Sequence, residues 1–212
     1  MLVIGLYDPM EKISYEFREE YNNYYSKIES SSVHYFKEEH NFDDYDLLIA
    51  IGKIDDTTIL GNPNVKIQII ERKEDRNEYF DSSIVVEDSN SYYQPIEQIL
   101  SSLLISGLLK FSIYDVKRYF KDEYSGLMYS KYFSLENLKL SEIKLPQNID
   151  MAFVLFLVGN KSNNMVDIMK SSKEYFDNNI SSLFFHFIGV DMDCDLYDMK
   201  VIYQYKEDKE SW

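Results

Sequence analysis

Side chains that could bind a metal ion or act as a nucleophile are present, but their spacing does not build a site. The three histidines have no ligand spacing, and His186, which lies between two phenylalanines, is interpreted as a strand residue. Four aspartates crowd together as in a calcium loop, but the stretch lacks the glycine and the terminal glutamate that such a loop needs. These are Asp191, Asp193, Asp195 and Asp198. Cys194 has no histidine or basic residue beside it to activate its thiol. The sequence therefore predicts no metal site and no cofactor.

Glycine-rich loops, which cradle phosphate groups, are also missing. Only glycine lets successive backbone N–H groups close around a phosphate, and the chain has 7 glycines in 212 residues. Gly52 ends a predicted strand at residues 46–52, and the loop that follows carries two carboxylates, Asp55 and Asp56. The first predicted strand runs into Asp8 and Pro9, where we expect Asp8 to cap a helix and Pro9 to be its first residue. No nucleotide-phosphate loop is predicted.

The composition narrows the class of protein. About 45% of the residues are hydrophobic, which is enough to fill a core. A net charge of −15 argues against nucleic acid as a partner, because phosphate backbones are held by lysine and arginine. The longest uncharged apolar stretch, residues 151–159, is too short to span a membrane, and the first residues do not resemble a signal peptide. A single cysteine fits a reducing compartment, so the expected location is the cytoplasm.

The pattern of apolar residues predicts an α/β protein. Five apolar runs in the first half read as strands of a parallel sheet covered by helices. The predicted strands cover residues 2–6, 33–36, 46–52, 65–70, 83–87, 151–158, 183–190 and 197–205. The predicted helices begin at Pro9 and after residue 164, and cover residues 92–109 and 113–120. Residues 131–150 are polar and irregular, and are interpreted as a connector.

The order of elements in the second half resembles the passage from the central helix into the C-terminal domain of FtsZ, the bacterial relative of tubulin. Residues 107–116, Gly-Leu-Leu-Lys-Phe-Ser-Ile-Tyr-Asp-Val, align without a gap with the family's "pGLINvDFaDV" type segment. Residues 126–128 fall where the family has a "G-x-A-M" type turn, and residues 181–190 and 197–205 resemble its closing strand pair. The resemblance implies a Rossmann-like parallel sheet with flanking helices, a central helix and a smaller α+β C-terminal domain. It places a shortened nucleotide-domain remnant at residues 1–109, the C-terminal-like domain at 110–206 and a tail at 207–212.

The same resemblance implies that the GTPase function has been lost. The family's G-G-G-T-G-T-G type loop would follow Ala50, where this chain keeps only Gly52 and places Asp55 and Asp56 near the expected phosphates. The family's pair of catalytic acidic residues falls on Ser112 and Asp115, and a serine cannot replace a carboxylate that orients water. By the residues alone, Asp115 is an acidic residue in the first turn of a helix. We therefore expect no enzymatic activity.

Two hypotheses follow. In the first, the chain is a non-catalytic FtsZ/tubulin-like protein that acts through protein contacts, either with itself or by regulating a polymer-forming relative. In the second, it is a small-ligand sensor or enzyme on an unrelated α/β fold. Its ligand would lie at the loops after Ile51 and Ile70, because ligands of such sheets bind beyond the carboxyl ends of strands.

Overall fold

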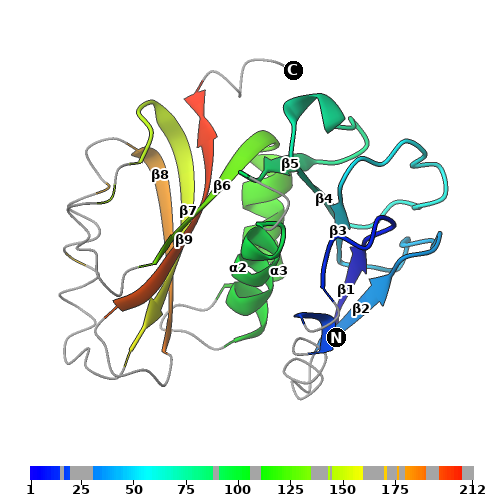
Figure 1. Ribbon diagram of the computed structural model, residues 1–212, viewed down its shortest axis with the longest axis horizontal. Coiled ribbons are helices and arrows are strands. Elements are labelled where there is room, and N and C mark those ends of the chain that lie inside the picture. Colours follow the sequence, from blue (N-terminus) through cyan, green and yellow to red (C-terminus); the bar gives the residue numbers. More distant parts are fainter. Residues whose placement is uncertain are drawn as a thin grey trace.

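In the part of the chain that the computed structural model describes, nine strands form one sheet, and the helices α2 and α3 lie near its middle (Figure 1). The strand order is β2-β1-β3-β4-β5-β6-β9-β7-β8. The residues that the structure describes are 1–14, 17–19, 31–87, 91–105, 111–134, 143, 145–159, 170, 176, 180–189 and 196–206.

The first five strands are parallel to one another. They are β1 (Leu2–Tyr7), β2 (Ser31–Phe36), β3 (Leu47–Ile51), β4 (Val65–Ile70) and β5 (Ser82–Val85). All five residues of β3 are buried, as the continuous apolar run predicted for a parallel strand covered on both faces. The five predicted strands of the first half are therefore confirmed, within two residues at each end.

The sixth strand corrects the sequence analysis. β6 (Gly126–Ser134) pairs in parallel with β5 and antiparallel with β9, so residues 126–128 begin a strand instead of a turn, and residues 131–134 are not a connector. The strand was missed because its second half has only one well-paired neighbour. Lys131 and Phe133 are half-buried and Tyr132 and Ser134 are exposed, so no apolar run marks the strand.

The last three strands complete the sheet. They are β7 (Ile149–Val158), β8 (Ile180–Gly189) and β9 (Leu196–Tyr205). β9 lies between β6 and β7 and is antiparallel to both, whereas β8 pairs in parallel with the far side of β7. The expected closing strands are thus both present, but they are not neighbours. The division of the chain at residue 109 stays a prediction.

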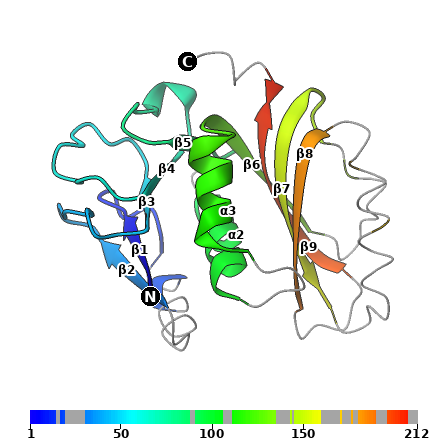
Figure 2. The same cartoon turned by 180° about the vertical axis from the view of Figure 1, so that it is seen from behind.

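Two helical segments stand between the parallel strands and the C-terminal strands in both views (Figures 1 and 2). α2 (Tyr93–Leu104) ends five residues before the predicted limit of 109, because Ile105 is already extended with φ −95° and ψ 129°. α3 (Ile113–Lys117) continues as a single π-helical turn over Arg118–Asp122. Of the helix predicted after residue 164, Lys170 and Phe176 are helical, and the rest lies outside the described residues.

The start of the first predicted helix was wrong. Asp8 does not cap a helix that begins at Pro9, because Glu11 has a positive φ of 50°, which a helix does not allow. Instead, Ser14 begins the helical segment at residues 17–19: its hydroxyl accepts the N–H of Phe17 at 3.2 Å and its carbonyl accepts the N–H of Arg18 at 3.2 Å. Both residue types cap helices well, so the local sequence alone did not choose between them.

Candidate functional site

β2 lies on one side of β1 and β3 lies on the other, so the side on which the chain adds its next parallel strand changes at β1. Ligands of α/β sheets usually bind at such a switch point, beyond the carboxyl ends of the strands. The loops at the carboxyl ends of these strands carry Asp8 and Gly52. The loop after β4 begins with Glu71 at the same edge of the sheet. The three loops define the candidate site, which we call the carboxyl edge.

Gly52 serves the backbone of its own loop. Its φ is 82°, in the left-handed region where a side chain is strained. Its N–H donates to the carbonyl of Ile69 at 2.8 Å, and its carbonyl accepts the amide of the Gln68 side chain at 3.0 Å. The sulfur of Met10 lies 3.5 Å from where a Cβ on Gly52 would stand. The N–H of this glycine is therefore already used, and the loop after β1 lies over it.

Asp55 and Asp56, the two carboxylates predicted near the phosphate position, are both exposed and held within their own loop. Asp55 pairs with the ammonium of Lys53 at 2.6 Å. Asp56 accepts the Thr58 hydroxyl at 2.6 Å and the Thr58 N–H at 2.9 Å, and these bonds hold the pKa of Asp56 below its usual value. Ile54, between Lys53 and Asp55, is buried and fixes the loop to the core.

Asp8 is fully buried at the end of β1 and accepts three hydrogen bonds. Two come from the backbone N–H groups of Lys12 and Ile13, each at 2.9 Å, and one from the hydroxyl of Tyr35 at 3.0 Å. Burial, and then the charge of Asp8, raise the pKa of Tyr35. The Asp8 carboxylate thus accepts the hydrogen bonds of the N–H groups with which this loop could otherwise bind an anion.

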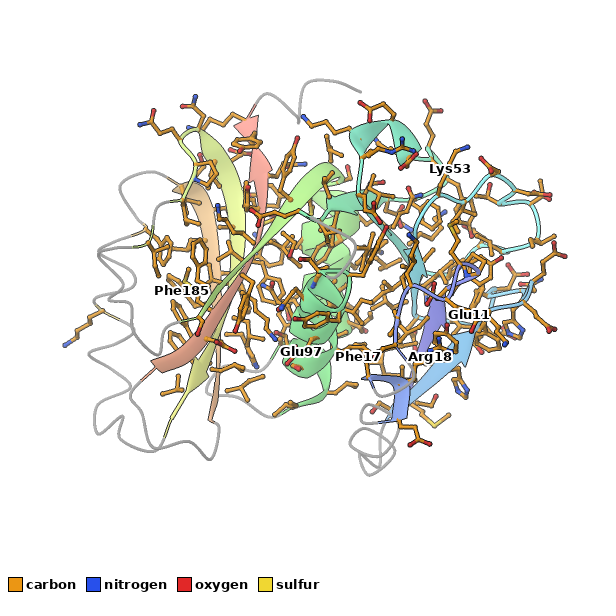
Figure 3. All side chains as sticks on the ribbon, in the orientation of Figure 1. Glu11, Phe17, Arg18, Lys53, Glu97 and Phe185 are labelled. Atoms are coloured by element: carbon orange, nitrogen blue, oxygen red, sulfur yellow. The ribbon has the colours of Figure 1, made fainter. Side chains whose placement is uncertain are left out.

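Ion pairs and a cation–π contact surround this loop. The guanidinium of Arg18 lies 4.2 Å from the ring centroid of Tyr35, donates to the carbonyl of Ile13 at 2.7 Å, and pairs with Glu11 at 3.8 Å (Figure 3). On the other side, Lys12 lies 3.4 Å from Glu71.

Glu71 in turn connects the carboxyl edge to the start of α2. It accepts the hydroxyl of Tyr92 at 2.9 Å, and burial together with this hydrogen bond raises the pKa of Tyr92. Sequence reasoning did not single out Tyr35, Glu71 or Tyr92. The position of Glu71 directly after the predicted strand at residues 65–70 was the one signal that pointed to this edge.

Ser112 and Asp115, the positions that match the family's catalytic pair, bond to each other at the start of α3. One oxygen of Asp115 accepts the Ser112 N–H at 2.8 Å and the Ser112 hydroxyl at 2.6 Å. The carboxylate thus lies in the first turn of α3, as the residues alone predicted. Among the described residues, no hydrogen bond or ion pair joins these two residues to Gly52, Asp55 or Asp56.

The other candidates of the sequence analysis are dispersed. Within the described ranges, no three histidine, cysteine or acidic side chains come together as metal ligands. His186 is a buried residue of β8, as predicted. Asp198 is buried in β9 and accepts the hydroxyl of Tyr132 at 2.7 Å, whereas residues 191–195 lie outside the described part of the chain. In the part of the chain that the structure describes, no helix is long and apolar enough to cross a membrane.

Comparisons with known proteins give a clear result at the level of structure. No protein-family profile matches the sequence, and no curated protein matches it. An empty FtsZ dimer from M. jannaschii superposes with a TM-score of 0.62 over 98% of this chain and 89% of that chain, at 8% sequence identity. CetZ from Methanosaeta thermophila superposes with a TM-score of 0.62 over 97% of this chain and 87% of that chain, at 10% identity. These coverages include the strands of both halves of the sheet, and they show that this chain has an FtsZ/tubulin-like fold.

Proposed function

We propose that this chain is a non-catalytic FtsZ/tubulin-like protein that has lost GTP binding and hydrolysis and acts through protein contacts. The observation that carries the proposal is the use of the carboxyl-edge N–H groups within the protein itself. The N–H groups of Lys12 and Ile13 donate to Asp8, that of Gly52 to Ile69, and that of Thr58 to Asp56. A phosphate at this edge would have to break these bonds before it could make its own.

Electrostatics support the same proposal. A carboxylate about 6 Å from a phosphate charge costs roughly 3 kcal/mol at an effective dielectric constant near 20. Asp8, Asp55 and Asp56 all belong to the loops that would surround a nucleotide. Lysines are present as well, but Lys12 and Lys53 are each paired with a carboxylate of the protein. At the positions that align with the family's catalytic acidic pair, the hydroxyl of Ser112 already donates to Asp115.

Nucleotide binding tests the first half of the proposal. Purified protein at about 50 µM is titrated with GTP and with GDP in the presence of Mg²⁺, with an authentic FtsZ as the positive control. A chain whose N–H groups are occupied gives no binding heat, and no nucleotide is released when the protein is denatured. Micromolar affinity for GTP or measurable release of phosphate would refute the proposal.

The partner is the second half of the proposal. We expect a protein, either a second copy of this chain or an FtsZ/tubulin-like polymer, and we expect no nucleic acid because of the net charge of −15. The proposed division into residues 1–109 and 110–206, and a cytoplasmic location, belong to this reading. Co-sedimentation with assembled FtsZ and sedimentation velocity of the protein alone distinguish the two partners. Recovery of neither, with strong recovery of an unrelated protein from the native host, would move the function away from the cytoskeleton.

A small-ligand sensor or enzyme is the alternative function, but its unrelated fold is set aside by the similarity to the solved structures. The observation in its favour is the group formed by Glu71, Tyr92 and Lys12 at the carboxyl edge. The substitution Glu71→Gln would then weaken binding of a ligand found by thermal-shift screening. If no ligand raises the melting temperature, the alternative loses its support.

A further inference from the structure

β2 is the outermost strand at one end of the sheet, and it lies at that end in both views (Figures 1 and 2). The carbonyl of Phe36 accepts the N–H of Asp8 at 2.8 Å, so the backbone groups of Phe36 point toward β1. Successive residues of a strand point their backbone groups to opposite edges, so those of Val33 and Tyr35 point away from the sheet. In the described part of the chain, no strand pairs with this outer edge.

The outer edge of β2 lacks the features that keep edge strands from pairing with another chain. Natural edge strands are commonly protected by a lysine, a proline or a bulge. Ser31–Phe36 contains no charged residue and no proline, and it pairs with β1 in unbroken register. The side chains of Val33, Tyr35 and Phe36 are only half-buried. A strand laid against this edge would therefore bury additional apolar surface, which favours its binding.

A second copy of β2 has the geometry to pair with this edge. When the two copies run in opposite directions about a two-fold axis at His34, Val33 of each copy lies opposite Tyr35 of the other. Both residues have outward backbone groups, so each of these pairs exchanges two N–H···O hydrogen bonds. A β-branched residue opposite an aromatic one is also a favourable cross-strand pair. The exposed His34 lies opposite its own copy.

Charge favours a second copy as the occupant of this edge. The chain carries a net charge of −15, so two copies repel each other over most of their surfaces. β2 is an uncharged segment, and the ring of His34 lies beside the rings of Phe36 and Tyr45, with centroids 6.4 and 6.0 Å apart. A basic partner would find no opposite charge along this strand. Two copies of the strand, in contrast, meet without opposing like charges.

We propose that two copies of this chain pair through the outer edges of β2, antiparallel about a two-fold axis at His34, so that their sheets join into one. The inference rests on the proposed function in taking a second copy of the chain as the protein partner, and it assigns the surface that this copy uses. Because both copies use the same edge, the contact is closed and produces a dimer, not a filament.

Cysteine cross-linking tests the register of the two strands. In a Cys194→Ser background, the two-fold axis puts the Cα atoms of position 34 about 4.5 Å apart, which suits a disulfide in His34→Cys. Lys37→Cys is the matched control, since this exposed residue follows the same strand but would lie about 20 Å from its copy. After mild oxidation with copper phenanthroline, we expect about tenfold more linked dimer from His34→Cys. Equal yields, or no dimer from either variant, would overturn the proposal.

Sedimentation velocity over low to high micromolar concentrations tests the dimer without oxidation. His34→Glu places two carboxylates opposite each other and should raise the dissociation constant of the dimer at least about tenfold. Ser181→Glu adds the same charge at an exposed position of β8, the strand at the other end of the sheet, and should leave the constant unchanged. Circular dichroism checks that both variants are folded.

Two outcomes contradict the proposed dimer. One is a chain that stays monomeric at every concentration, and the other is a dimer that Ser181→Glu weakens as much as His34→Glu does. Neither outcome bears on nucleotide binding, because the titration with GTP tests the loss of GTP binding separately. Failure of the β2 contact is therefore distinguishable from failure of the proposed function.

Discussion

The carboxyl edge of the parallel strands and the contact of α2 with β7 and β9 both bury polar groups, but they satisfy those groups to different degrees. We call the second contact, which is made by Gln98 with Phe153 and by Glu97 with Lys200, the α2 seam. At the carboxyl edge, Asp8 accepts three hydrogen bonds, and the fully buried Gln68 makes four. At the seam, Gln98 makes one and leaves its oxygen without a partner among the described residues. A satisfied polar network fixes one arrangement of the chain, whereas an unsatisfied one permits another.

At the carboxyl edge the buried donors and acceptors serve each other and form a closed network. We expect the α2 seam to be the less stable of the two contacts, because it leaves the Gln98 oxygen without a partner among the described residues. We therefore expect substitutions to be costly at the edge and cheap at the seam.

The largest effect is expected at Asp8. The substitution Asp8→Ala leaves the N–H groups of Lys12 and Ile13 and the hydroxyl of Tyr35 without their acceptor, and should lower the free energy of unfolding by about 4 kcal/mol. Urea denaturation followed by circular dichroism measures it. Asp8→Asn, which keeps one acceptor oxygen, should cost about half as much. A loss below about 1 kcal/mol for Asp8→Ala would mean that the edge is not a closed network.

Gln68 is the next test of the edge. Its amide donates to the carbonyls of Gly52 and Asp75, and its oxygen accepts from Asn77 and Ser83. Gln68→Leu keeps the size of the side chain but leaves all four partners unsatisfied, which should cost about 3 kcal/mol. Differential scanning calorimetry should show a lower melting temperature. An unchanged melting temperature would contradict the account of the loop after β3.

Gly52 should be needed for its backbone conformation and not for a phosphate. Gly52→Ala places a Cβ at φ 82°, with only the Met10 sulfur nearby at 3.5 Å, so the cost is backbone strain of about 1–2 kcal/mol. Gly189→Ala is the matched control, because nothing lies within 4 Å of its added carbon and its φ is not positive. Equal stability of the two variants in urea would remove the reason for a glycine at position 52.

The smallest effect is expected at Gln98, which is the counterpart of Gln68. Gln98→Leu removes the side-chain donor to the carbonyl of Phe153, and it removes an acceptor that has no partner among the described residues. The two changes oppose each other, so the free energy of unfolding should change by less than about 1 kcal/mol in either direction. The same urea measurement applies to both glutamines. A loss as large as that of Gln68→Leu would show that the seam is as well satisfied as the edge.

Much of the fold could be predicted from the sequence because parallel strands leave a strong local signal. The apolar runs around β1, β3, β4 and β7 identified those strands within two or three residues at each end. β6 left no such signal, because half of its side chains remain accessible to water. The sequential reading also made β8 and β9 neighbours, since nothing in either strand tells which other strand it will pair with.

For the candidate site too, residue type and order decided one part and folding decided the other. The sequence by itself determined that phosphate-binding glycines are missing and that Gly52, Asp55 and Asp56 follow the third strand, because these are properties of residue type and order. Only the tertiary structure decided what the polar residues do. Tyr35 reaches Asp8 from another strand, Glu71 reaches Tyr92 across the start of α2, and Lys200 reaches Glu97 from more than a hundred residues away. Hydrogen bonds and ion pairs act over about 3–4 Å, and only folding brings such partners that close.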